Sequence, residues 1–126
     1  MKIRILVVDD ELSMREFLSI LLEREGYDVS VAGSAEEALR LIELSLFDLV
    51  LSDVQMPGLS GIELLSRIKR ISPETGVLMV TAFSAAEQAV EAMKLGAYDY
   101  IAKPFKIEEI KQLVKNALEK QGLKRE

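Results

Sequence analysis

Short apolar runs alternate with longer amphipathic segments along the 126 residues of the chain. The short runs have the length and composition of buried strands, whereas in the longer segments apolar residues recur at helical spacing. Strands are predicted at residues 3–8, 28–32, 48–52, 77–80 and 98–102. Helices are predicted at residues 12–25, from 35 to about 44, from the loop 56–61 to about 71, from about 85 to 95, and at 107–120.

Local signals mark the ends of several predicted helices. Ser34 with Glu37, and Ser84 with Glu87, have the spacing of a capping box at a helix start. Gly26 follows the first helix and is a typical stop. The pattern amounts to five strand-then-helix units in one domain, which predicts an α/β fold with a parallel sheet and helices on both faces.

Polar residues stand at the carboxyl ends of four predicted strands. Sheets of this kind bind ligands in the crevice beyond those ends. Taken singly, each residue has an ordinary interpretation, as a helix cap, a turn residue, a strand residue or a solvated lysine. The residues are Asp9 and Asp10 after the first strand, Asp53 after the third, Thr81 after the fourth and Lys103 after the fifth.

The convergence of these side chains on one sheet edge favours a phosphate site. Two carboxylates about 4 Å apart repel each other by roughly 4 kcal/mol at an effective dielectric constant near 20, so three together require a cation. Oxygen ligands without cysteine or histidine point to Mg²⁺. Lys103 adds a positive charge and Thr81 a neutral donor. Asp53, followed by Gly58 and Gly61 in its loop, is the expected nucleophile for an aspartyl-phosphate.

The composition narrows the chemistry further. The chain has no cysteine and no histidine, which excludes disulfides, Cys/His zinc sites and histidine-based triads. A net charge of −5 disfavours direct nucleic-acid binding by this chain. The apolar runs are too short to span a membrane, and the N-terminal run ends in two aspartates rather than a cleavage site, so the expected compartment is the cytoplasm.

Four segments, in order, resemble the receiver domain of bacterial two-component response regulators. They are LVVDDE (6–11), LVLSDVQMPGLSGIELL (49–65), VTAFS (80–84) and GAYDYIAKPF (96–105). The last is most similar to the NtrC-like regulators, whose receivers control an ATPase domain acting on σ54-dependent transcription. The resemblance implies a flavodoxin-like sheet of strand order 2-1-3-4-5 with five helices, a receiver domain at residues 1–121, and a linker or tail starting at 122–126.

The resemblance also implies a role for each site residue. Asp53 accepts a phosphoryl group from a phosphohistidine of a partner histidine kinase. Lys103 contacts that group, and the Lys103–Pro104 bond is cis. The implied Mg²⁺ ligands are Asp9, Asp10, Asp53 and the backbone carbonyl of Gln55.

A switch and an output surface are implied as well. Thr81 swings to bond the phosphoryl oxygen and Tyr100 turns inward, although a plain core aromatic remains an alternative reading of Tyr100. Ala82 keeps access to the site open. Gln55 and Phe83 occupy positions that tune phosphoryl lifetime, and Phe83 cannot orient a water, which predicts slow self-dephosphorylation.

The expected output runs through the surface of the fourth helix, fifth strand and fifth helix, at about residues 85–120. It changes homodimerisation or contact with another domain, and the domain catalyses only its own phosphorylation and dephosphorylation. A receiver cut from a longer protein, with an ATPase and DNA-binding output domain elsewhere, is favoured over a stand-alone regulator acting by protein–protein interaction.

Three other functions fit the pattern less well. An aspartate-nucleophile phosphatase needs a second aspartate two positions after the first, where this chain has Gln55. A flavodoxin-like cofactor module needs a Ser-, Thr- or Gly-rich loop after the first strand, where this chain has Asp9, Asp10 and Glu11. Only the acidic cluster argues against a purely structural interaction domain.

Overall fold

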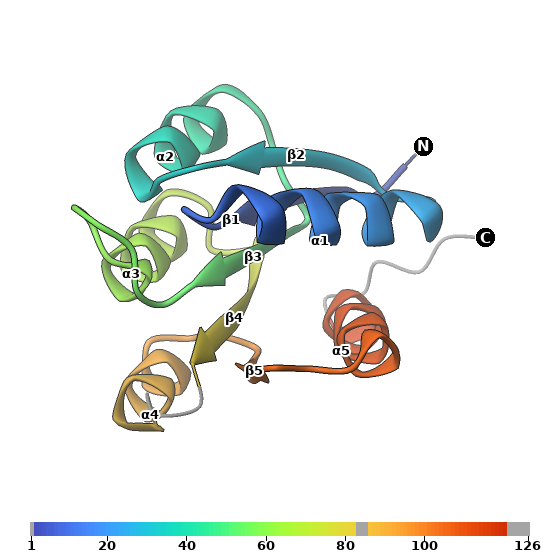
Figure 1. Cartoon of the computed structure of the whole chain (residues 1–126). Helices are drawn as coiled ribbons and strands as arrows, with labels where there is room; N and C mark the ends of the chain where they lie inside the picture. The colour runs from blue at the N-terminus through green and yellow to red at the C-terminus, as the bar shows by residue number, and fades with distance from the viewer. Residues whose placement is uncertain (1, 83–85, 121–126) are drawn as a thin grey trace.

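The computed structural model describes residues 2–82 and 86–120, without the side chains of residues 82 and 86. Its core is one parallel sheet with strand order β2-β1-β3-β4-β5 (Figure 1). The predicted fold class and strand order are therefore confirmed. The strands are β1 (Arg4–Val8), β2 (Asp28–Ala32), β3 (Leu49–Asp53), β4 (Gly76–Ala82) and β5 (Asp99–Lys103).

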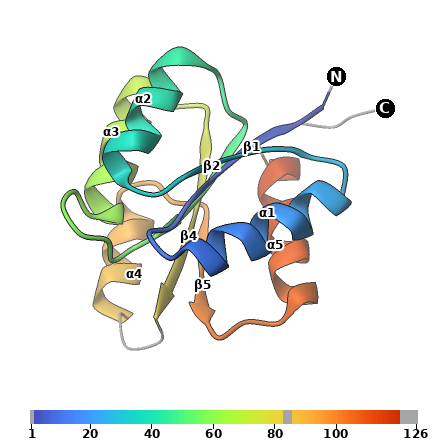
Figure 2. The ribbon, with the colours of Figure 1, turned by 45° about the horizontal axis from the view of Figure 1, so that its top comes forward.

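Helices cover both faces of the sheet, with α2, α3 and α4 on one side and α1 and α5 on the other (Figure 2). The first four helices each run back from the end of one strand to the start of the next, as a parallel sheet requires, and the fifth follows the last strand. The helices are α1 (Leu12–Arg24), α2 (Ala35–Leu44), α3 (Gly61–Ile71), α4 (Ala86–Lys94) and α5 (Ile107–Lys120).

The continuous apolar runs of the sequence correspond to strands that are buried on both faces. In β1, Leu6 and Val8 face the α2–α3–α4 side, whereas Ile5 and Val7 face the α1–α5 side. All four side chains are at most 1% exposed. A strand packed on both faces has no polar side to alternate with, which explains why β1 reads as an unbroken apolar run.

Helix ends follow the local signals, with one addition. The Ser34 hydroxyl accepts from the Glu37 amide at 3.1 Å, as the capping box predicts. Ser60 caps α3 in the same way, accepting from the Glu63 amide at 3.2 Å, a signal that the prediction overlooked. The second predicted box includes Ser84, which lies outside the described residues, as does the predicted tail at 122–126.

Phe17 of α1 and Ile107 of α5 are apolar residues that remain partly exposed. Ile107 is 47% exposed because it is the first residue of α5, ahead of the turn that packs on the sheet at Ile110. Phe17 is 40% exposed and lies beside Phe105, with ring centroids 6.4 Å apart. No helix in the described part of the chain is long and apolar enough to cross a membrane.

Candidate functional site

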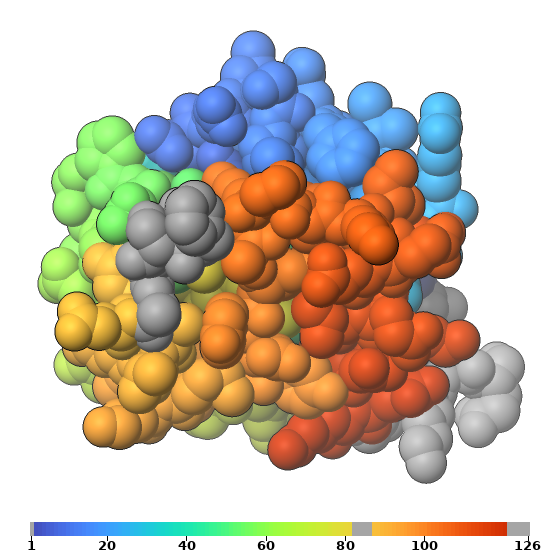
Figure 3. Space-filling view, turned by 60° about the horizontal axis from the view of Figure 1, so that its bottom comes forward, coloured from blue at the N-terminus to red at the C-terminus, as the bar shows by residue number. Residues whose placement is uncertain are grey.

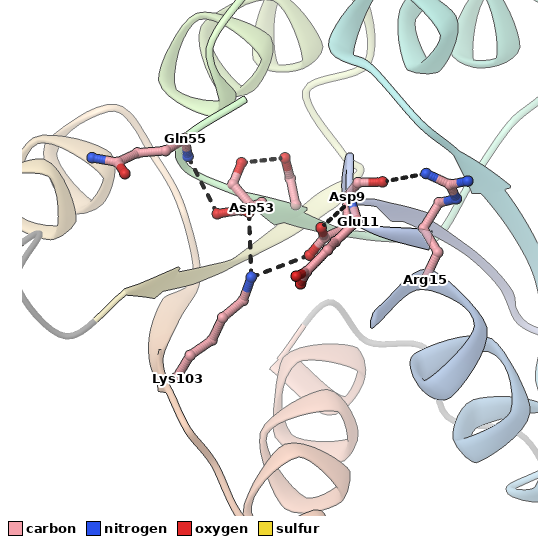
Figure 4. A network of polar contacts seen from close by, with 7 residues as sticks. Asp9, Glu11, Arg15, Asp53, Gln55 and Lys103 are labelled. Carbon is pink, nitrogen blue, oxygen red and sulfur yellow. Dashed lines mark hydrogen bonds and ion pairs between the residues drawn. The ribbon is translucent and has the colours of Figure 1, made fainter. Parts of the chain in front are cut away.

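The carboxyl edge of the sheet gathers the acidic and basic side chains that the sequence places there (Figure 4). Asp9 follows β1, while Asp53 and Lys103 are the last residues of β3 and β5. The Lys103 Nζ lies 3.3 Å from Oδ2 of Asp9 and 3.3 Å from Oδ2 of Asp53. Residues 94 positions apart in the chain thus form one ion-pair cluster because parallel strands all end at the same edge.

Three carboxylates of this cluster have a spacing that suits a hard divalent cation. One oxygen each from Asp9, Asp10 and Asp53 lies within 4.8 Å of the others. Oxygen ligands around an octahedral Mg²⁺ at about 2.1 Å lie roughly 3 to 4 Å apart, and Mg²⁺ keeps several waters. The donors therefore fit Mg²⁺ after small side-chain movements, with Asp10 exposed enough to leave room for water.

Burial and neighbouring charges set the protonation of the site. Burial raises the pKa of Asp53, while Lys103 and the Gln55 amide lower it in part and Asp9 raises it further, so the pKa lies above its ordinary value. Burial lowers the pKa of Lys103, but Asp53 and Asp9 outweigh that effect, and its pKa is raised. The lysine is therefore firmly protonated, and the aspartate carries a charge that its surroundings only partly stabilise.

The loop after Asp53 packs tightly against the site. The Gln55 amide donates to Oδ1 of Asp53 at 3.2 Å. A Cβ at Gly61 would collide with the backbone carbonyl of Asp53, so only glycine fits at the start of α3. Gly58 has φ = 79°, in the left-handed region that glycine adopts without strain. Gly61 is therefore required for close backbone approach to Asp53, whereas Gly58 is required for the conformation of its own backbone.

The predicted switch residues lie on β4 and β5, the two strands at the Lys103 side of the sheet. Thr81 is 2% exposed in β4 and pairs in register with Ala102 of β5. Tyr100 is 43% exposed. The Lys103–Pro104 peptide bond is cis. The side chain of Ala82 and all of Phe83 lie outside the described residues, so their predicted roles stay predictions.

One face next to the site is formed by α4, β5 and α5, and we call it the α4–β5–α5 face (Figure 3). Its strand, β5, is the last strand of the sheet and ends in Lys103. Apolar side chains on these elements are exposed to solvent by 41 to 56%. They are Val90, Met93, Tyr100 and Ile107.

Three contacts to the site were not predicted from the sequence. The Arg15 guanidinium donates to the Asp9 carbonyl at 2.8 Å. The Glu36 carboxylate accepts from the amide of Leu59 in the β3–α3 loop at 3.2 Å. Gln88 of α4 accepts from the Gln55 side chain at 3.3 Å. The residues joined by the last two contacts are 23 and 33 positions apart in the chain. No local sequence pattern predicts pairs this far apart.

The sequence pattern of the response regulator receiver domain matches residues 5–115 of the chain. The chain belongs to this family. The predicted receiver identity, and with it a place in two-component signalling, is therefore confirmed.

Curated relatives of the receiver are regulatory proteins. The transcriptional regulatory protein ZraR of Salmonella typhimurium is 44% identical over 117 residues, covering 93% of this chain and 26% of that protein. The regulatory protein AtoC of Escherichia coli is 38% identical over 123 residues, covering 98% of this chain and 27% of that protein. The chain thus spans about a quarter of the length of these relatives.

Solved structures agree with the fold in detail. NtrX from Brucella abortus is 38% identical with a TM-score of 0.92, and the match covers 98% of this chain and 28% of that one. A CheY-like receiver domain protein from Methanospirillum hungatei is 34% identical with a TM-score of 0.93, covering 97% of this chain and 98% of that one. Receivers from larger regulators and small receiver-sized chains therefore both share this backbone.

Proposed function

We propose that Asp53 accepts a phosphoryl group from a phosphohistidine of a partner histidine kinase. The observation that carries the proposal is the Asp53 carboxylate held between the Lys103 ammonium and the Asp9–Asp10 pair at the carboxyl edge of the sheet. A carboxylate oxygen of Asp53 attacks phosphorus and forms an O–P bond. The P–N bond breaks, and the histidine nitrogen leaves with the electron pair.

The side chains around Asp53 divide the remaining tasks. The residues that would hold Mg²⁺ are Asp9, Asp10, Asp53 and the backbone carbonyl of Gln55. Bound Mg²⁺ supplies positive charge to the transferring phosphoryl oxygens. Lys103 would donate to a further phosphoryl oxygen, and the Thr81 hydroxyl would donate to the phosphoryl group once it is attached.

The stored phosphoryl group acts as a signal by changing a neighbouring surface. It adds about −1.5 to −2 charge at one point, which must bias an element with two arrangements. Thr81 moves toward the group, Tyr100 turns inward, and the α4–β5–α5 face changes its contacts. That face controls homodimerisation and, in an NtrC-like regulator of the cytoplasm, an ATPase output domain that acts on σ54-dependent transcription.

The experiment is phosphorylation by acetyl phosphate with Mg²⁺, followed by intact mass measurement. We expect the wild-type chain to gain one phosphoryl group that is acid-stable and base-labile, and to gain none when EDTA removes the metal. Asp53→Asn should gain none, whereas Asp28→Asn, which removes an exposed carboxylate at the start of β2, should behave as wild type. Equal phosphoryl yield in Asp53→Asn would overturn the proposal.

A further inference from the structure

The backbone of Asp9 is held from two sides just below the acidic cluster. Its amide donates to the Ala32 carbonyl at the end of β2, at 3.1 Å. Its carbonyl accepts from Nη1 of Arg15, one turn into α1, at 2.8 Å (Figure 4). We infer that Arg15 is a positioning residue, which aims the carboxylates of Asp9 and Asp10 at the metal; this inference rests on the proposed Mg²⁺ site.

The reason lies in which atom Arg15 contacts. The Asp9 carboxylate already has partners, the Glu11 amide at 2.9 Å and the Lys103 ammonium at 3.3 Å. The Asp9 carbonyl belongs to the peptide unit that leads into Asp10. A charge-assisted hydrogen bond to that oxygen fixes the plane of the peptide unit, and the plane determines the direction in which the Asp10 side chain leaves the backbone.

Gly33, in the turn between β2 and α2, completes the support. A Cβ built on Gly33 would lie 3.0 Å from Nη1 and 3.5 Å from Cζ of Arg15. The guanidinium therefore lies in space that glycine leaves open. The φ of Gly33 is outside the left-handed region, so alanine suits the backbone there. The added methyl group would make its tightest contacts with Arg15, and Oε1 of Glu37 at 3.7 Å would be an ordinary van der Waals neighbour. The Gly33 amide is fixed in turn by the Glu37 carboxylate at 2.8 Å.

The expected effect has a sign that separates positioning from charge. Arg15 is a cation near a cation site, so loss of its charge by itself would tighten Mg²⁺ binding through weaker repulsion. Loss of the hydrogen bond from Arg15 to the Asp9 carbonyl misaligns the Asp9 and Asp10 carboxylates and weakens Mg²⁺ binding. Residues that hold metal ligands in place typically contribute about tenfold or more to metal affinity. Weaker binding in Arg15→Met therefore cannot come from the lost charge.

The test is calorimetric titration of the whole chain with Mg²⁺. We expect Arg15→Met to raise the Mg²⁺ dissociation constant about tenfold. Gly33→Ala, which changes no charge, should raise it several-fold, and the double variant should match Arg15→Met because both changes remove the same contact. The control is Arg24→Met, which removes the same charge from the last turn of α1 and should leave affinity unchanged or slightly tighter.

A second readout excludes a general loss of structure. In metal-free protein, the amide resonances of Asp10 and Glu11 should shift in both single variants, while the urea midpoint stays near that of Arg24→Met. Unchanged or tighter binding in Arg15→Met, or additive effects in the double variant, would overturn the inference. Failure of the wild type to bind Mg²⁺ would overturn the proposed metal site itself, and the inference with it.

Discussion

Asp53 is a residue that the fold tolerates rather than one that stabilises it. Its side chain is only 12% exposed, and burial is the main cause of its raised pKa. The Lys103 ion pair compensates for part of that burial but not all of it. A carboxylate kept under these conditions is typical of a functional site, where charge is retained for chemistry at the expense of stability.

Replacement of Asp53 by asparagine should therefore stabilise the metal-free protein at neutral pH. A raised folded-state pKa means that ionised Asp53 opposes folding above that pKa, and that the opposition disappears below its ordinary value of 3.8. Urea unfolding in EDTA should show Asp53→Asn more stable than wild type at pH 7, with a gain that shrinks as the pH falls through the folded-state pKa. A less stable variant at pH 7 would contradict this reading of the site.

Lys103 should affect the metal and the phosphoryl group in opposite directions. Its ammonium repels Mg²⁺ but attracts the phosphoryl oxygens. Lys103→Met should therefore bind Mg²⁺ several-fold more tightly and accept phosphoryl from acetyl phosphate about 10²-fold more slowly, the usual effect of losing one transition-state donor. Magnesium titration measures the Mg²⁺ affinity, and a phosphorylation time course measures the rate of phosphoryl transfer. Lys106→Met, a few residues along the chain, is the control and should change neither by much.

At the scale of elements, the β3–α3 loop joins the site to the helices on one face of the sheet. Glu36 of α2 holds the Leu59 amide, and the Gln55 side chain reaches Gln88 of α4. Gly61 brings the start of α3 against the Asp53 carbonyl, and its amide donates to the Val54 carbonyl at 2.9 Å. The loop is thus fixed at its ends and along its length.

Two glycine substitutions should separate site damage from simple backbone strain. Gly61→Ala must displace the Asp53 carbonyl, so we expect a loss of about 2–3 kcal/mol in the free energy of unfolding and weaker Mg²⁺ binding. Gly26→Ala meets no atom within 4 Å but has φ = 95°, so it should lose about 1–2 kcal/mol and leave Mg²⁺ affinity unchanged. Denaturant unfolding and metal titration test both; unaltered Mg²⁺ affinity in Gly61→Ala would argue against a rigid loop.

Sequence periodicity predicted every strand and helix of the described structure, with shifts of one or two residues at the ends. One of those shifts has a tertiary cause. Asp48 was expected to begin the third strand, but its carboxylate instead accepts from the Arg4 amide at 2.8 Å and the strand begins at Leu49. The Ser60–Glu63 cap was visible in the sequence. The contacts of Arg15 and Glu36 could not be predicted from the sequence, because they depend on how the helices pack above the sheet.

For the whole molecule, the decisive fact is that a parallel sheet collects the ends of distant strands. The sequence predicted this edge, and the structure places Asp9, Asp10, Asp53 and Lys103 together there. The proposed phosphoryl chemistry followed from the positions and the types of these four residues. The movements of Thr81 and Tyr100 need experiment, because their proposed roles depend on a second arrangement of the same chain.

That second arrangement should appear as a change in assembly. Beryllofluoride with Mg²⁺ mimics the phosphoryl group, and sedimentation should then show association of the wild-type chain through the α4–β5–α5 face. Thr81→Val keeps the shape of the buried side chain but removes the hydroxyl, so it should still accept phosphoryl from acetyl phosphate yet associate less. An identical assembly state and unchanged surface amide resonances with beryllofluoride would contradict the switch.

The most direct test of the central claim is to locate the phosphoryl group. After phosphorylation with acetyl phosphate and Mg²⁺, borohydride reduces an aspartyl-phosphate to homoserine and releases phosphate, and peptide mass spectrometry then identifies the changed residue. We predict homoserine at position 53 and unmodified aspartate at positions 9 and 10. Homoserine at another position, or none in protein that has taken up phosphoryl, would contradict the assignment of Asp53 as the acceptor.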